Sequence, residues 1–205
     1  MMDPSTSNVC VTSYNSGGMG VDKQNYIKTL LLFSDVLCLQ EHFLLDSGNK
    51  KFNNTYKLRQ NFSDTHDMVI NPAIKSNIYV SKGRGSGGLA ILWRKCLTKY
   101  VTNIKCESYR LQAIKFNFPE AELLVINVYL MVDSQLENFD DNGLLQILAE
   151  LNRIIGLSDC KNILLSGDLN CDFSRNTHFV NIIRDFILEK GLNIFWTMPD
   201  NSETQ

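Results

Sequence analysis

The sequence predicts an α+β fold in one compact domain. Six short apolar runs rich in β-branched residues are typical of strands, at residues 9–14, 36–39, 89–93, 111–116, 123–129 and 163–165. Two of these strands follow each other directly through a turn at residues 118–120, which favours α+β layers over a strictly alternating parallel sheet. The chain has 205 residues, 44% of them hydrophobic, and no linker divides it, so we expect a single core.

Three segments with apolar residues at helical spacing predict helices, at residues 22–32, 144–155 and 179–188. Gly156 is expected to end the second helix, because glycine commonly follows a helix. Asn176 or Thr177 is expected to cap the third, with Gly191 beyond its end. The polar, weakly periodic segment at residues 46–80 predicts an elaborated loop region over one end of the sheets.

Composition excludes several classes of protein. The chain carries 20 Lys and Arg against 22 Asp and Glu, so any nucleic-acid binding must come from a local basic surface. The six cysteines are scattered with no CxxC pair, which is typical of a reducing compartment. No signal peptide and no apolar run long enough for a membrane span is present, so we expect an intracellular protein that does not enter a membrane.

Polar residues follow four of the predicted strands and are the candidates for chemistry: Asn15, Gln40, Glu41, Asn127, Tyr129, Asp168 and Asn170. Glu41 and Asp168 supply the carboxylate oxygens that Mg²⁺ prefers. The amides of Asn15 and Asn170 can hold a phosphate oxygen or a water, and the Tyr129 hydroxyl can donate to phosphate. Each residue taken alone is equally typical of a turn or a half-buried core position. Our functional interpretation therefore depends on the order of these residues along the chain.

That order is Asn15, then QE at residues 40–41, GRGSGGLAILW at residues 83–93, NVY at residues 127–129 and GDLN at residues 167–170. It resembles the endonuclease/exonuclease/phosphatase superfamily, over residues 9 to about 196. Within that superfamily the blocks look most like the apurinic/apyrimidinic endonuclease-like domain of retrotransposons that lack long terminal repeats (LINE-type elements).

The resemblance implies a four-layer α/β/β/α sandwich of the DNase I type and phosphodiester cleavage that depends on Mg²⁺ or Mn²⁺. By position, it makes Glu41 the metal ligand, and Asn15 a support for metal or phosphate. Asp168 belongs to the same metal set and aligns or deprotonates the attacking water. Tyr129 and Asn170 contact the phosphate. Gly87 and Gly88 take a packing role, because a Cβ would obstruct close approach there.

The sequence departs from the superfamily pattern at its end. Members continue from the GDLN strand to a strand bearing Asp and to a final SDH-like motif whose His contacts the scissile phosphate. We therefore interpret residues 1–205 as a single domain lacking its last strands and that motif. His66, in the SDTH stretch at residues 63–66, precedes GDLN and is expected to be a loop histidine.

Three functions stay open. The first is a monomeric endonuclease that nicks target DNA in the nucleus and shares a polyprotein with a reverse transcriptase. The second is a catalytically dead fragment that at most binds nucleic acid. The third is a phosphatase or phospholipase of the same superfamily. Without the final strands, we expect the strand at residues 163–165 to expose unpaired backbone groups, and the chain to be inactive and prone to aggregation.

Overall fold

A computed structural model describes residues 9–46, 55–75, 85–131 and 141–194. The chain divides into two compact units, residues 1–170 and residues 171–205. All of the described strands belong to the first unit, which therefore determines the layers of the fold.

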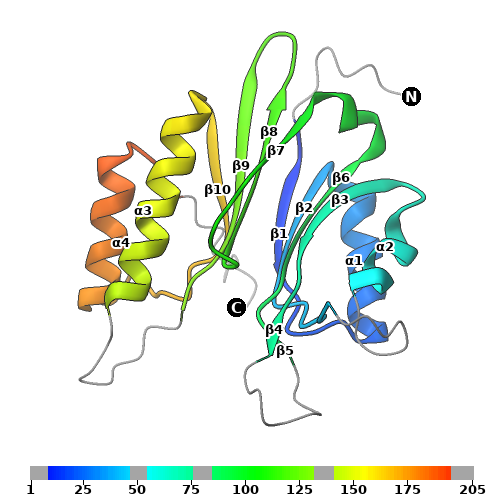
Figure 1. The fold of residues 1–205 in the computed structure, drawn as a ribbon, viewed down its shortest axis with the longest axis horizontal. Coiled ribbons are helices and arrows are strands. Elements are labelled where there is room, and N and C mark those ends of the chain that lie inside the picture. Colours follow the sequence, from blue (N-terminus) through cyan, green and yellow to red (C-terminus); the bar gives the residue numbers. More distant parts are fainter. Residues whose placement is uncertain (1–8, 47–54, 76–84, 132–140, 195–205) are drawn as a thin grey trace, which may run out of the picture. The chain divides into compact units, whose positions relative to one another are not determined.

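Two four-stranded sheets form the centre of the first unit (Figure 1). The first has the order β1 (Val11–Asn15), β2 (Val36–Gln40), β6 (Leu89–Arg94), β3 (His66–Asn71). The second has the order β10 (Ile163–Asp168), β9 (Glu122–Tyr129), β8 (Leu111–Asn117), β7 (Val101–Ile104). Strands β1 and β2 are parallel, as are β9 and β10, and the other pairs in the two sheets are antiparallel. All six predicted strands are present.

Alternation along β2 shows how the layers pack. Val36 and Cys38 join the core between the two sheets, together with Ile91, Ile114 and Val125 of other strands. Leu37 and Leu39 point to the opposite face and pack in a second core with helix residues. Because successive side chains of a strand face opposite sides, β2 is buried on both faces, which explains its continuous apolar run.

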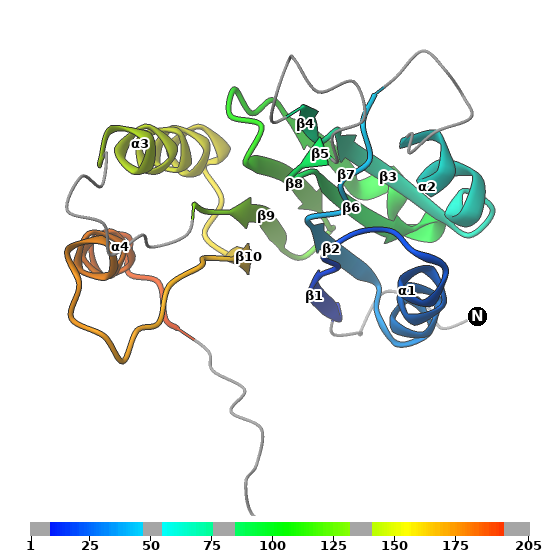
Figure 2. The ribbon, with the colours of Figure 1, turned by 90° about the horizontal axis from the view of Figure 1, so that it is seen from below.

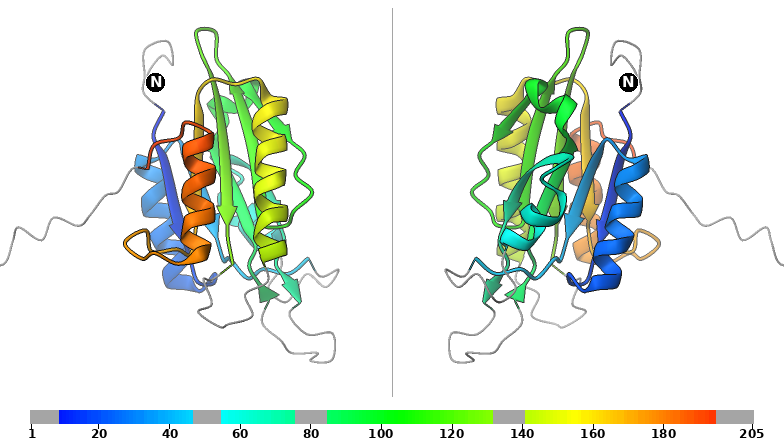
Figure 3. Two further views of the ribbon diagram at one scale, coloured as in Figure 1. Left: turned by 90° about the vertical axis from the view of Figure 1, so that its left-hand side faces the viewer. Right: turned by 90° about the vertical axis from the view of Figure 1, so that its right-hand side faces the viewer.

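Helices cover the outer face of each sheet (Figure 3). Helix α1 (Val21–Phe33) and helix α2 (Thr55–Phe62) bury Ile27, Leu31, Leu58 and Phe62 against the first sheet. Helix α3 (Asp141–Ser158) lies against the second sheet, and a 3-10 helix, η1 (Lys95–Tyr100), follows β6. The order of helices, sheet, sheet and helix confirms the predicted α+β class and its layering.

Two predictions about local structure were wrong. Helix α3 continues through Gly156 to Ser158, and it is Asp159, with φ of 48°, that takes the left-handed conformation after the helix. The segment at residues 46–80 is not only loop. Its described part contains α2, β3 and β4 (Ile74–Lys75), which pairs with β5 (Gly85–Ser86). Helix α2 buries only Leu58 and Phe62, so its apolar pattern is too sparse to be recognised in the sequence.

The second unit contains helix α4 (His178–Glu189). Its N-terminus is capped by Thr177, whose Oγ1 accepts a hydrogen bond from the Val180 N–H at 3.3 Å. Gly191 follows the helix with φ of 62° and donates to the Leu188 carbonyl at 3.0 Å. Between the two predicted caps, the structure therefore selects Thr177.

Strand β10 lies at an edge of the second sheet. Among the described residues it pairs with β9 alone, and all six of its residues are only partly buried. No helix within the described ranges is long and apolar enough to cross a membrane.

Candidate active site

The parallel pairs β1–β2 and β9–β10 bring five candidate side chains to one end of the two sheets, which Figure 2 views from that side. Asn15, Tyr129 and Asp168 are the last residues of β1, β9 and β10. Glu41 follows β2 directly, and Asn170 follows β10 by two residues. The strand directions alone thus explain why residues so distant in sequence meet.

Two of the hydrogen bonds that join the first sheet to the second involve the candidate side chains. The Asn15 Nδ2 donates to Asp168 Oδ2 at 2.7 Å, and the Tyr129 hydroxyl donates to Glu41 Oε1. Asp168 also accepts from the Asn170 N–H at 2.9 Å through Oδ1. Each carboxylate is therefore held by a partner, and both oxygens of Asp168 have a donor. The five candidates thus form two hydrogen-bonded groups at the same end of the sheets, Asn15 with Asp168 and Asn170, and Glu41 with Tyr129. We refer to the two groups together as the cluster.

The backbone at the cluster is in an uncommon conformation. Glu41 and Asn170 have φ of 54° and 49°, and they are two of only four non-glycine residues with positive φ in the described part of the chain. Such conformations cost on the order of 1–3 kcal/mol for most residues and are often found at functional sites. Asparagine tolerates this region well, so the larger cost falls on Glu41.

Burial and the neighbouring carboxylates both act on the Tyr129 hydroxyl. Burial, the hydrogen bond to Glu41 and the charges of Glu41 and Asp168 together raise the pKa of Tyr129 to about 12, although the nearby Arg110 opposes this shift. The Tyr129 hydroxyl therefore stays protonated at neutral pH and acts as a donor.

The donor set fits a hard divalent cation held by few protein ligands. Mg²⁺ is typically bound through one or two carboxylates, keeps several waters and takes further oxygens from phosphate. Within the described part of the chain no hydrogen bond engages Glu41 Oε2, whereas both oxygens of Asp168 accept one. Within the described residues, no three His, Cys, Asp or Glu side chains gather into a closed metal cage. Glu41 is therefore the carboxylate of the cluster with an oxygen available to such a cation.

Comparison with models of known protein families shows to which family the chain belongs. Residues 12–200 match the model of the endonuclease/exonuclease/phosphatase family. The chain belongs to this family. The family is one of hydrolases and takes its name from endonucleases, exonucleases and phosphatases. No curated protein sequence matches the chain.

Solved structures of this family show the same fold at low sequence identity. An AP endonuclease from Leishmania major has a TM-score of 0.61 and 15% identity, over 89% of this chain and 66% of that one. A 3' phosphatase from Neisseria, bound to product DNA hairpin, has a TM-score of 0.61 and 18% identity, over 89% and 71%. The endonuclease domain of TRAS1, a telomere-specific non-LTR retrotransposon, has a TM-score of 0.54 and 10% identity, over 90% and 71%.

Two polar strand residues that seemed comparable in sequence lie beneath the cluster and not in it. Gln40 and Asn127 are 1% and 0% exposed. Gln40 Nε2 donates to Asn127 Oδ1 at 2.7 Å, and Asn127 Nδ2 faces the carbonyls of Leu39 at 3.0 Å and Ala90 at 3.2 Å. These bonds satisfy buried polar groups and hold the two sheets together directly under Glu41 and Tyr129.

The glycines near the cluster have different roles. A Cβ on Gly88 would lie 2.5 Å from the His42 ring, which confirms the predicted packing role. A Cβ on Gly87 would lie 3.8 Å from the Tyr129 ring, an ordinary contact, so the packing prediction is wrong there. Gly87 is required instead by its φ of 71°. Gly167 has φ of 138°, and a Cβ there would lie 2.0 Å from the Val128 carbonyl oxygen.

His66 is not a loop residue, contrary to the prediction. It begins β3, is 6% exposed, and its Nδ1 contacts Thr65 Oγ1 at 2.8 Å. Strands β2 and β3 run in the same direction because both are antiparallel to β6, so the start of β3 lies at the end of the sheet opposite Glu41. His66 therefore cannot contribute to this cluster.

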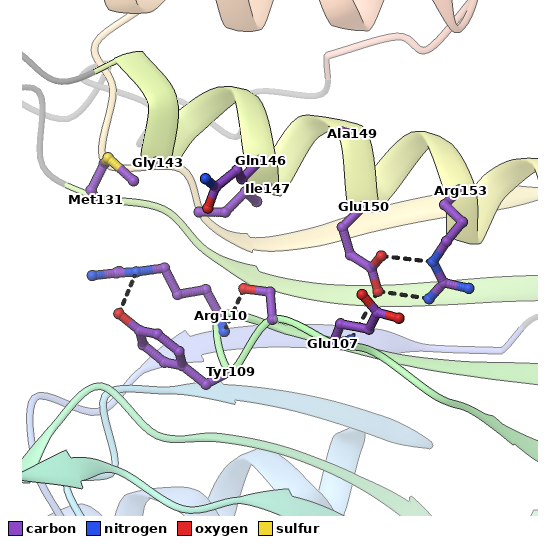
Figure 4. A pocket seen from close by; sticks show the side chains of 11 residues that line it. Glu107, Tyr109, Arg110, Met131, Gly143, Gln146, Ile147, Ala149, Glu150 and Arg153 are labelled. Atoms are coloured by element: carbon purple, nitrogen blue, oxygen red, sulfur yellow. Dashed lines mark hydrogen bonds and ion pairs between the residues drawn. The ribbon is translucent and has the colours of Figure 1, made fainter.

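Sequence reasoning missed Arg110, which lies beside Tyr129. Its Nη1 donates to the Tyr129 carbonyl at 3.3 Å, and its guanidinium lies 5.2 Å from the ring centroids of both Tyr129 and Tyr109. Arg110 also lines a cavity of about 650 Å³, which Glu150 and Arg153, paired at 2.7 Å, border farther along α3 (Figure 4). Arg110 precedes β8 in a polar stretch, and no sequence pattern distinguishes it from other surface arginines.

Proposed function

We propose that this chain is a DNA endonuclease that uses Mg²⁺ or Mn²⁺ to hydrolyse a phosphodiester bond, of the type that nicks target DNA for a non-LTR retrotransposon. The observation that carries the proposal is that Glu41 and Asp168, from different sheets, lie at the same end of the fold and are each hydrogen-bonded across to the other sheet, by Tyr129 and by Asn15. Two carboxylates whose charges both act on the same tyrosine hydroxyl are unfavourable on a surface that is merely solvated, because like charges repel.

The roles follow from the partners of each side chain. Glu41 holds the cation, which when bound would polarise a phosphate oxygen and offset its charge. Asp168 orients and deprotonates the attacking water, since donors from Asn15 and Asn170 fix both of its oxygens. The Tyr129 hydroxyl, kept protonated, donates its single proton to Glu41 in the structure and would turn it to a phosphate oxygen once substrate is bound. Asn15 and Asn170 complete the site without adding negative charge.

Arg110 is the proposed contact for the DNA backbone. The whole chain has a formal net charge of −2, so attraction for a polyanion must be local. Arg110 is half buried beside Tyr129, and in the described ranges no carboxylate pairs with it. We place a phosphate next to the scissile one against this guanidinium, whose fork suits phosphate oxygens.

The retrotransposon assignment, with a nuclear location, a monomeric domain and a reverse transcriptase on the same polyprotein, extends this proposal. It is supported by the QEH and GRGSGG blocks and by the fold shared with the TRAS1 endonuclease domain. The fold is also shared with the Neisseria 3' phosphatase, so a DNA phosphatase is the second candidate.

A plasmid-nicking assay with Mg²⁺ or Mn²⁺, run beside an oligonucleotide ending in a 3' phosphate, tests the proposal. Conversion of supercoiled to relaxed circles, abolished by chelation and by Asp168→Asn, is the expected result. Phosphate release without nicking would replace the endonuclease by the phosphatase. A gel shift of DNA without either reaction would identify a binding remnant, and no effect on DNA at all would overturn the proposal.

A further inference from the structure

His42 follows Glu41 and is fully buried, with an exposed fraction of 0%. Both ring nitrogens meet backbone groups. Nδ1 accepts the Leu44 N–H at 3.0 Å, and Nε2 lies 3.1 Å from the Asn71 carbonyl and 3.3 Å from the Leu89 carbonyl. Since a backbone N–H can only donate and a carbonyl can only accept, the neutral ring with its proton on Nε2 satisfies every partner.

The position of the ring depends on Gly88. A Cβ on Gly88 would approach three ring atoms of His42 at 2.5, 2.7 and 2.9 Å, closer than real Cβ contacts. Gly88 also has φ of 94°, which disfavours other residues. The ring thus fills a slot bounded by Gly88, the end of β3 at Asn71 and the start of β6 at Leu89.

The residues on either side of His42 in the chain both have a strained backbone conformation, and the slot holds them in place. Glu41 and Phe43 have φ of 54° and 55°. Their backbone groups are tied separately, because the Glu41 carbonyl accepts from Gly18 at 2.8 Å and the Phe43 N–H donates to Gly87 at 3.0 Å. Conformations of this kind persist only where their surroundings over-determine them, and the buried ring between the two residues supplies that constraint.

We propose that His42 is a positioning residue for Glu41: its ring, seated against Gly88 and bonded to the backbone of β3 and β6, holds Glu41 in the left-handed conformation that directs its carboxylate to Tyr129. The role of Glu41 as the metal ligand rests on the proposed function, whereas its placement against Tyr129 does not. His42 itself touches neither phosphate nor water, because both of its nitrogens are engaged.

The test compares His42→Phe, which keeps the ring volume and loses the hydrogen bonds, with His66→Phe, the same change at a buried histidine at the opposite end of the sheet. We expect His42→Phe to raise the Mn²⁺ concentration for half-maximal nicking at least tenfold. His66→Phe should lower the melting temperature by a similar amount and leave this Mn²⁺ concentration unchanged. His42→Asn retains an acceptor for the Leu44 N–H and should recover part of the effect. Gly88→Ala, which displaces the ring, should reproduce it.

A second readout does not need activity. In protein with ¹³C-labelled tyrosine, the signal of the Tyr129 carbon that bears the oxygen, assigned with Tyr129→Phe, reports its hydrogen bond to Glu41. His42→Phe and Glu41→Ala should shift this signal alike, and His66→Phe should not. An unchanged signal and metal requirement in folded His42→Phe, or in His42→Asn if the Phe variant does not fold, overturns the proposal. If the wild type does not nick DNA but the Tyr129 signal shifts as expected in the variants, the proposed function is rejected and the positioning role of His42 stands.

Discussion

Replacing Asp168 by Asn changes one oxygen of the site into an NH₂ group and tests the role of the carboxylate with little change in volume. Two donors face this side chain, Asn15 Nδ2 at 2.7 Å and the Asn170 N–H at 2.9 Å. The new amide has a single acceptor, so one donor loses its partner. Asn15 cannot turn its own amide to compensate, because its Oδ1 accepts the Gly17 N–H at 3.0 Å.

The effects on stability and on rate should differ strongly. Loss of one hydrogen bond in a partly exposed site costs about 1 kcal/mol of unfolding free energy, which lowers the melting temperature of a chain of this size by roughly 2–4 °C. Loss of a positioned general base costs about 10²–10⁴ in rate, or roughly 2.7–5.4 kcal/mol in activation free energy. Catalysis should therefore fail while the fold survives.

Initial nicking rates at saturating Mg²⁺, measured beside thermal unfolding, check this expectation. Glu122→Gln is the matched control, because Glu122 is a carboxylate at the other end of β9, about 23 Å along the strand from Tyr129, and is paired with Lys115 at 2.8 Å. The control should nick at the wild-type rate. Asp168→Asn with more than a third of the wild-type rate would refute the assignment of Asp168 as base.

Three further outcomes are expected. Glu41→Gln should raise the metal concentration needed for half-maximal nicking at least tenfold, measured by Mg²⁺ titration, because an amide is a weaker ligand than a carboxylate; an unchanged titration would exclude Glu41 as ligand. Tyr129 has a raised pKa of about 12, so the stability it contributes is complete below its ordinary pKa and is lost as pH rises towards 12. Tyr129→Phe should flatten the alkaline fall of melting temperature in that window, and an identical fall in both proteins would contradict the shift. In Gly167→Ala the new Cβ would lie 2.0 Å from a carbonyl oxygen, so the variant should not fold or should melt more than about 5 °C lower in calorimetry. This is roughly the effect of 1–3 kcal/mol of overpacking. A normal melting temperature would show that β10 can shift.

Strands β2, β6, β8 and β9 were predictable because most of their residues are buried. The apolar run of β2 and the long run of β9 are continuous signals of this kind. Strands β1 and β10 contain no fully buried residue and were predictable only from short β-rich runs. Helix α2 and strand β3 gave no such signal, because α2 buries two side chains and β3 is only partly buried along most of its length. Sparse burial leaves a polar sequence that local pattern cannot separate from a loop.

The site was predictable in composition and not in geometry. The order of motifs placed Asn15, Glu41 and Asp168 together, yet nothing in it separated Gln40, which is buried beneath the site, from Glu41, its neighbour in the chain. The difference arises because the chain turns into a left-handed conformation after β2, and this depends on the distant Gly88. Because Gly88 acts on Glu41 only through the folded structure, the local sequence around Glu41 does not reveal this conformation.

The bonds that join Asn15 to Asp168 and Glu41 to Tyr129 across the sheets also determine when the site can form. Asn15 and Asp168 are 153 residues apart in the chain, and Glu41 and Tyr129 are 88 apart. Closing loops of this length costs entropy that is recovered only when the partner sheet has docked, so these contacts belong to the slow, non-local part of folding. A nascent chain that has not yet made β10 has every strand of the first sheet but lacks Asp168, so under the proposed function it would be unable to cut. The proposed nuclease becomes competent in one late step, when the second sheet closes against the first.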